Sequence, residues 1–193
     1  MLALLIELQR LKRLERTGWS LRGMPAGTES VAAHSFGVSI TAMLLADELV
    51  SRGGHVDMDK LLRMALVHDW AEARVGDMPR TTTNYFGSEA RKNAETSAFA
   101  DMTQRVSNSD LYRDLFQQYE ERQSLESRLV KAADVIDLLV QVLALERSGA
   151  RGLDEFWEAA HGHSLEFESP ARELVNEVMN SLLEQRAAVL SST

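Results

Sequence analysis

The stretch SLESRLVKAADVIDLLVQVLALERS, residues 124–148, decides the fold class of this chain. Apolar side chains recur in it at three- and four-residue steps, which places them on one face of an α-helix. A helix with one apolar face must bury that face against other helices or a sheet. The face carries Leu125, Leu129, Ala133, Ile136, Val140 and Leu143.

The helical spacing continues on both sides of this stretch, and no segment alternates apolar and polar residues as a half-buried strand would. Residues 17–29 contain three Gly and one Pro, so we expect a loop there, followed by a helix that Ser30 caps. The other expected helices cover residues 2–15, 30–51, 58–73, 86–105, 109–122, 153–161 and 169–189. The sequence therefore predicts an all-α, single-domain helical bundle over residues 1–193.

The composition limits the kinds of protein that this chain can be. Its net charge of −8 argues against a partner held along a nucleic-acid backbone, because such binding surfaces are basic. It contains no Cys, which excludes disulfides and thiolate metal sites and fits a reducing compartment. The apolar start at 1–6 is too short to span a bilayer and lacks a preceding basic region. We expect a cytoplasmic protein with neither a nucleic-acid polymer nor a membrane as partner.

Two imidazoles and two carboxylates form the main chemical signal in the sequence. His34, the pair His68-Asp69 and Asp134 lie on three different expected helices, and bundle cores build metal sites from facing helices. A nitrogen and oxygen ligand set without sulfur suits a hard or borderline divalent metal. A His-Asp dipeptide alone is weak evidence, and Asp134 can also pair with Lys131 one turn earlier.

Four motifs resemble the HD-domain metal-dependent phosphohydrolases, and most closely their 5′-deoxynucleotidase branch. The matching stretches extend over residues 11–146, and the third of them is the most specific. They are LKRLERTGW (11–19), ESVAAHSFGVS (29–39), HDWAEARVGDMPR (68–80) and ESRLVKAAD (126–134).

The resemblance implies a role for eight side chains. His34, His68, Asp69 and Asp134 would ligate one divalent metal ion, of which Mn²⁺, Co²⁺ and Mg²⁺ are the foremost candidates. Glu72 and Asp77 would handle the protons of the attacking water and the leaving group, and Arg16 and Trp19 would line the nucleotide pocket.

The chain departs from the family pattern in two places. Thr17 and Gly18 separate Arg16 from Trp19, and Ala33 replaces the acid that often precedes the first His. For Trp19, base stacking and a hydrophobic plug over the core are equally open. Further along, Arg91, Lys92 and Glu95 are expected to be solvated or to pair with one another.

The chemistry of these residues fits phosphomonoester hydrolysis. A divalent metal lowers the pKa of bound water and neutralises phosphoryl oxygens, and a guanidinium binds phosphate with two parallel hydrogen bonds. We expect attack of metal-bound water on the 5′-phosphate of (deoxy)nucleoside monophosphates. The alternatives are a phosphohydrolase of nucleoside di- or triphosphates or of a specialised nucleotide, and a non-catalytic, metal-stabilised nucleotide-binding module. The resemblance also implies a homodimer.

Overall fold

The computed structural model describes residues 1–161 and 166–191, and within these ranges the chain is helical. The described residues form no strand, and the single isolated β-bridge joins Glu15 to Ser30. The all-α prediction is confirmed. Across the described ranges, none of the helices has the length and apolar character needed to span a bilayer.

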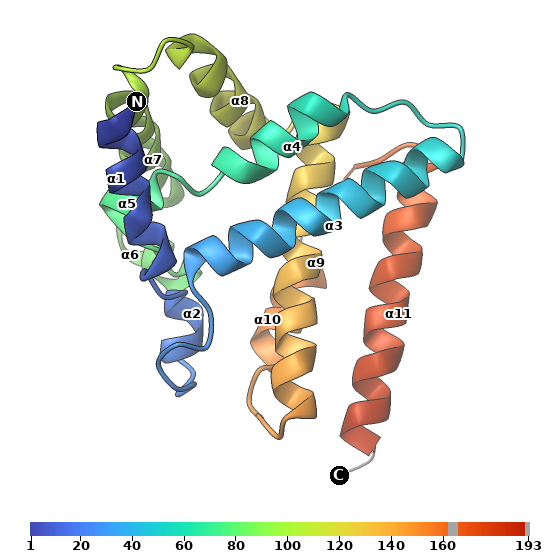
Figure 1. Cartoon of the computed structure of the whole chain (residues 1–193). Helices are drawn as coiled ribbons and strands as arrows, with labels where there is room; N and C mark the ends of the chain where they lie inside the picture. The colour runs from blue at the N-terminus through green and yellow to red at the C-terminus, as the bar shows by residue number, and fades with distance from the viewer. Residues whose placement is uncertain (162–165, 192–193) are drawn as a thin grey trace. The chain divides into compact units, whose positions relative to one another are not determined.

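The helices follow one another along the chain as drawn in Figure 1. Their bounds are α1 Leu2–Leu8, the 3₁₀ helix η1 Gln9–Lys12, α2 Thr17–Ser20, α3 Val31–Ser51, α4 Met58–Val67, α5 Glu72–Val75, the 3₁₀ helix η2 Arg80–Thr82, α6 Thr83–Phe86, α7 Ser88–Thr103, α8 Ser109–Glu121, α9 Leu125–Arg147, α10 Asp154–His161 and α11 Ala171–Ser191.

These helices form two compact units. The first comprises Met1–Phe36 and Leu66–Glu121, and the second comprises Gly37–Ala65 and Arg122–Thr193. The first unit therefore contains α1, α2, α5, α6, α7 and α8, and the second contains α9, α10 and α11.

Two of the long helices begin where the sequence places a cap. The Ser30 hydroxyl accepts a hydrogen bond from the Ala33 N–H at 3.1 Å, just before α3. The Ser124 hydroxyl accepts one from the Ser127 N–H at 3.2 Å at the start of α9. Both contacts satisfy an N–H that has no partner within its helix, which fixes the point where the helix begins.

The predicted apolar face of α9 is buried at four of its six residues. Leu129, Ala133, Ile136 and Leu143 are buried, whereas Leu125 is half-buried and Val140 is 48% exposed. The predicted helix over residues 2–15 is also wrong in part, because α1 ends at Leu8 and a 3₁₀ turn continues the chain. The loop expected at 17–29 contains the short helix α2.

The first unit is built on a core that α1, η1, α3, α5 and α7 share. Its buried members are Leu4, Leu11, Val31, Ala73 and Met102, with Leu8, Leu14, Ala32, Trp70 and Val106 packed around them. The aromatic rings of Trp70 and Phe99 stack at 6.2 Å, and Phe99 stacks on Phe116 at 4.3 Å. This core holds the segment from His68 to Gly76 in place.

The predicted helix over residues 58–73 ends early, and this changes how its side chains point. Regular α4 stops at Val67, and the next N–H groups bond only three residues back, Trp70 to Val67 and Glu72 to Asp69. His68, Asp69 and Glu72 therefore do not share a helix, contrary to the prediction. At this point the Trp70 ring stacks on Phe99, which holds the chain on the tighter path.

The second unit centres on α9, which packs against α10 and α11. Figure 1 shows α9 and α11 running side by side. Between them lies an ion pair: Glu146 is 3% exposed, and Arg186 donates to its carboxylate at 3.1 Å. Arg186 also binds Asp154 and lies 4.9 Å from the centre of the Trp157 ring.

Replacing Arg186 with Met should destabilise the protein because it leaves the Glu146 carboxylate buried without its cation. We expect the free energy of unfolding, measured by urea denaturation, to fall by roughly 3 kcal/mol. The control is Arg52→Met, which removes an ion pair with Glu48 and Glu177 at the surface and should cost much less. Equal losses in the two variants would contradict the role given to the buried pair.

Candidate metal centre

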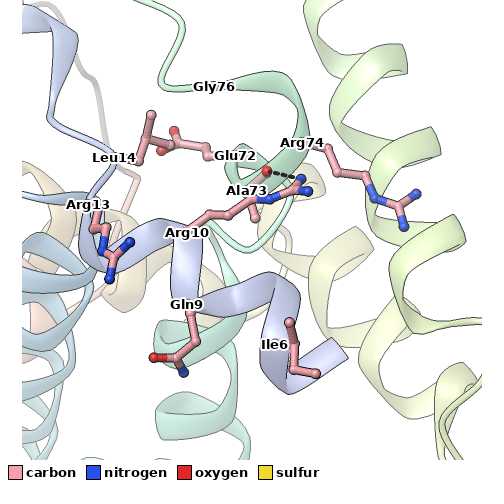
Figure 2. A pocket seen from close by; sticks show the side chains of 9 residues that line it. All are labelled: Ile6, Gln9, Arg10, Arg13, Leu14, Glu72, Ala73, Arg74 and Gly76. Carbon is pink, nitrogen blue, oxygen red and sulfur yellow. Dashed lines mark hydrogen bonds between the residues drawn. The ribbon is translucent and has the colours of Figure 1, made fainter. Parts of the chain in front are cut away.

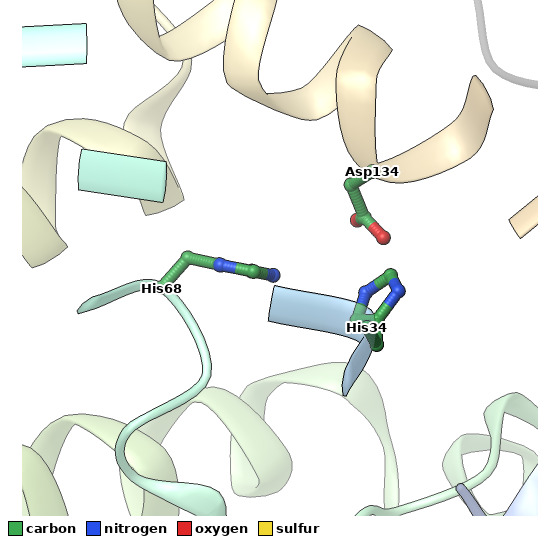
Figure 3. A group of neighbouring side chains, drawn as sticks. All are labelled: His34, His68 and Asp134. Carbon is green, nitrogen blue, oxygen red and sulfur yellow. The ribbon is translucent and has the colours of Figure 1, made fainter. Parts of the chain in front are cut away.

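The first unit brings two imidazoles and a carboxylate together at one point. His34 lies in the first turn of α3 and is 1% exposed, and His68 directly follows α4 and is 4% exposed. Asp69 Oδ2 lies 3.1 Å from His68 Nε2 and 3.8 Å from His34 Nε2. The two imidazole rings are 5.7 Å apart and point toward one another (Figure 3).

This arrangement fits a divalent metal ion. Ligand atoms that surround one cation at bond lengths of about 2.1 Å lie about 3 Å from each other, which is close to the separation seen here. The Oδ2 atom of Asp69 is buried and accepts no hydrogen bond from the described residues. Buried charged atoms of this kind require an ion or a hydrogen-bond partner. His34, His68 and Asp69 therefore form a group that can hold a metal.

Asp134, the fourth predicted ligand, belongs to the second unit. It lies on α9, and Lys131 Nζ contacts its Oδ2 at 2.6 Å, which is the alternative that the sequence left open. Figure 3 draws its side chain together with the two imidazoles. Its role as a ligand stays a prediction.

Beside Asp69, Arg16 and Asp77 form a charged pair. Arg16 Nη1 lies 3.4 Å from Asp77 Oδ1 and 3.6 Å from Asp69 Oδ2. The backbone N–H of Thr17 donates to Asp77 Oδ2, and the Thr17 hydroxyl donates to the Asp77 carbonyl at 2.6 Å. Thr17, which in the sequence is only a departure from the family pattern, thus holds Asp77 in place.

Backbone pairing of two short segments orients Arg16. The Arg16 N–H donates to the Glu29 carbonyl at 3.0 Å, and the Val31 N–H donates to the Leu14 carbonyl at 2.8 Å. Because Val31 begins α3, these contacts tie the Arg16 backbone to the helix that carries His34.

Neighbouring charges shift the pKa values of the buried carboxyl groups of Asp69 and Glu72 in opposite directions. Burial alone would raise the pKa of Asp69, but the charges of His68, His34 and Arg16 outweigh it and hold that pKa below its ordinary range. Burial raises the pKa of Glu72 well above its ordinary value, and the negative charges of Asp69 and Asp77 raise it further. Glu72 Oε2 is buried and accepts no hydrogen bond from the described residues.

Trp19 is a buried residue in this structure. Its side chain is 2% exposed, and its indole N–H donates to Glu29 Oε2 at 2.6 Å. Of the two roles that the sequence leaves open for Trp19, base stacking and a hydrophobic plug over the core, the burial of the ring agrees with the plug. Base stacking on this ring would require the ring to become exposed.

A hollow of about 630 Å³ opens beside Glu72 in the same unit. Figure 2 shows its lining side chains, with Arg10 donating to the Ala73 carbonyl at 3.2 Å. The lining is Ile6, Gln9, Arg10, Arg13, Leu14, Glu72, Ala73, Arg74 and Gly76. Arg74 donates to both carboxylate oxygens of Glu7, and Arg10 Nη1 lies 3.7 Å from the same carboxylate.

Comparison with known proteins decides the family. A family model described as HD domain matches residues 8–174, which include the candidate metal centre. The chain belongs to the HD domain family. This single match runs through parts of both units.

Several relatives of this HD domain carry a functional name. It is 31% identical over 197 residues to a protein of Saccharomyces cerevisiae named 5′-deoxynucleotidase YGK1, covering 99% of this chain and 85% of that protein. It is 29% identical to 5′-deoxynucleotidase HDDC2 of Xenopus laevis, covering 94% of this chain and 85% of that one. Among solved structures, the PH0347 protein of Pyrococcus horikoshii OT3 superposes with a TM-score of 0.82 at 34% identity, covering 96% and 99% of the two chains.

The raised pKa of Glu72 makes the stability of the metal-free protein depend on pH. A carboxyl group that binds its proton more tightly in the folded than in the unfolded chain lowers stability as pH rises between its two pKa values. Glu72→Gln removes this penalty. In chelator, we therefore expect Glu72→Gln to resist urea better than wild type at pH 8 and to match it at pH 4.

The control for this measurement is Glu89→Gln, because Glu89 is an exposed carboxylate on α7. It should leave the urea midpoint unchanged at both pH values. A Glu72→Gln protein that is less stable than wild type at pH 8 would contradict the assignment of a destabilising buried charge.

Proposed function

We propose that this protein is a metal-dependent phosphohydrolase that removes the 5′-phosphate of nucleoside monophosphates, with deoxynucleotides as preferred substrates. One observation carries the proposal: His34, His68 and Asp69 converge in the first unit with Glu72, Asp77 and Arg16 alongside. Relatives that are about 30% identical over nearly the whole chain are named 5′-deoxynucleotidase, which supports the choice of substrate.

The proposed ligands of the metal are His34, His68, Asp69 and Asp134. Asp134 is included because its motif follows the other ligands in the order of the family, and two imidazoles with two carboxylates suit Mn²⁺, Co²⁺ or Mg²⁺. A bound divalent ion supplies a lowered water pKa and neutralises charge on the phosphoryl oxygens.

Proton transfer falls to Glu72 and Asp77. Glu72 Oε2 has no donor among the described residues. A bound divalent ion would offset the carboxylates that raise the pKa of Glu72, and the ionised group could then accept a proton from the attacking water. Asp77 accepts contacts from Arg16 at Oδ1 and from the Thr17 N–H at Oδ2, and it would pass a proton taken up from solvent to the leaving 5′-oxygen. A positioned acid or base of this kind contributes roughly 10² to 10⁴ in rate.

Substrate binding is assigned to Arg16 and Trp19. The Arg16 guanidinium lies between Asp69 and Asp77, where it can bind phosphoryl oxygens as negative charge develops on them. Trp19 would line the nucleotide pocket once its ring, which is buried and bonded to Glu29, becomes exposed.

We also propose a cytoplasmic homodimer in which residues 1–193 act as one HD domain. The exposed side of α3 supports the dimer, because Phe36, Ile40 and Leu44 follow one another at four-residue steps and are 69%, 38% and 59% exposed. An exposed apolar stripe of this kind marks an interaction surface. The absence of Cys fits the reducing cytosol.

Phosphate release tests the proposed function. Chelator-stripped protein should release inorganic phosphate from 5′-deoxyribonucleoside monophosphates once Mn²⁺, Co²⁺ or Mg²⁺ is added, and more slowly from the ribonucleotides. Asp69→Ala should abolish release because it removes a ligand, and Glu72→Ala should lower kcat by about 10² to 10⁴.

The control is Asp59→Ala, which removes a 75% exposed carboxylate of α4 and should leave kcat unchanged. Stoichiometric metal binding without phosphate release from any monophosphate would contradict the proposal. Release of pyrophosphate or of phosphate only from di- and triphosphates would move the protein to the alternative substrate class.

A further inference from the structure

Arg91 and Glu95 form a partly buried ion pair on α7, which is one of the two arrangements expected from the sequence. Arg91 Nε donates to Glu95 Oε1 at 2.7 Å, and the two residues are one helical turn apart. The Glu95 side chain is 11% exposed, whereas that of Arg91 is 34% exposed. Within residues 1–161 and 166–191, this is the one hydrogen bond that the Arg91 guanidinium donates, so its Nη groups remain available to a ligand.

The helix that carries this pair packs against the segment that holds the candidate metal centre. α7 contacts α5, which begins at Glu72. Phe99, one turn beyond Glu95, stacks on Trp70, and Trp70 directly follows Asp69. Arg91, Glu95 and Phe99 follow one another at four-residue steps, so they share the face of α7 that is turned to this segment.

Charge interactions agree with this placement. Burial alone would lower the pKa of Arg91, but the carboxylates of Glu95, Glu72 and Asp69 outweigh it and raise that pKa above its usual value. Arg91 is therefore within electrostatic range of two side chains of the candidate centre.

Even with a divalent ion at the proposed metal site, a second fixed guanidinium nearby would strengthen the binding of a phosphate dianion. Asp69, Glu72 and Asp77 present up to three negative charges, and Arg16 contacts two of these groups. A phosphate monoester arrives as a dianion, and like charges repel it unless fixed positive groups face it. Arg91 has terminal N–H groups to offer, whereas its Nε is already used by Glu95.

We propose that Arg91 binds the phosphate of the substrate and that Glu95 is the positioning residue that orients the Arg91 guanidinium. The inference rests on the proposed phosphohydrolase function and adds a second phosphate-binding guanidinium to Arg16. With Nε fixed by Glu95, both Nη groups face one way and form the fork that suits two phosphoryl oxygens.

Affinity for inorganic phosphate, measured by calorimetry at saturating Mn²⁺, tests the inference without turnover. Arg91→Met should weaken phosphate binding by about tenfold or more, and Arg91→Lys should restore only part of it, because a lysine gives no fork. In kinetic assays Arg91→Met should raise KM more than it lowers kcat. Lys92→Met, on the same helix and 48% exposed, is the control and should bind phosphate as wild type does.

Glu95 needs a separate comparison because an unpaired buried carboxylate can unfold the protein. The double variant Arg91→Met with Glu95→Gln avoids that charge and should also lose phosphate affinity. Glu95→Gln alone keeps the Arg91 charge, so it should weaken phosphate binding less than Arg91→Met does.

Two outcomes overturn the inference. In the first, both variants that lack Arg91 bind phosphate as tightly as the wild-type protein does. In the second, the wild-type protein shows no measurable phosphate binding. Failure of the proposed function is distinguishable: phosphate binding that depends on Arg91, without hydrolysis of any nucleoside monophosphate, supports the phosphate site and contradicts the nucleotidase.

Discussion

The burial of several ionisable side chains at one point is the constraint on which the rest of the first unit depends. His34 and His68 are almost wholly buried, and Asp69 Oδ2 lies within 4 Å of both Nε2 atoms. Removing a carboxylate from water is costly unless a cation or donors compensate. The chain supplies part of that compensation through Arg16, and a divalent metal would supply the rest. Burial and the neighbouring carboxylates raise the pKa of Glu72. This shift shows that the site carries excess negative charge when no added cation is present.

The surrounding fold keeps this arrangement from relaxing. Trp70 is packed on Phe99, and the chain on either side of it makes tight turns that carry Asp69 and Glu72. Asp77 is fixed by Thr17, which follows Arg16 directly. A site held by packed aromatic rings and backbone contacts is preorganised, so its polar groups need little rearrangement when charge develops on a substrate.

That His34, His68 and Asp69 lie close together could be expected from the sequence, because metal ligands are restricted to few residue types and the motif spacing is specific. Their roles as ligands stay proposals. Most helices were predictable too, since their apolar periodicity is regular and serine caps mark two starts. The end of α4 was not, because Trp70 continues the apolar spacing of the helix although its backbone has already turned. The exposure of Val140 was predicted wrongly, and the role of Trp19 was left open, for a related reason. The spacing of apolar residues shows which side chains share a helix face, whereas their exposure depends on which neighbouring element covers that face. The contacts of Thr17 with Asp77 and of α7 with Trp70 join segments that are distant in the sequence. Local sequence patterns do not predict such contacts.

The most direct test is electron spin-echo spectroscopy of the Mn²⁺-loaded protein, which detects imidazole nitrogens bound to the metal. We expect couplings to two imidazole nitrogens, with one lost in His34→Gln and one lost in His68→Gln. His55→Gln, which changes an exposed histidine, should keep both couplings. A Mn²⁺ spectrum without histidine nitrogen couplings, or one that neither His34→Gln nor His68→Gln alters, would contradict the assignment of this cluster as the metal centre.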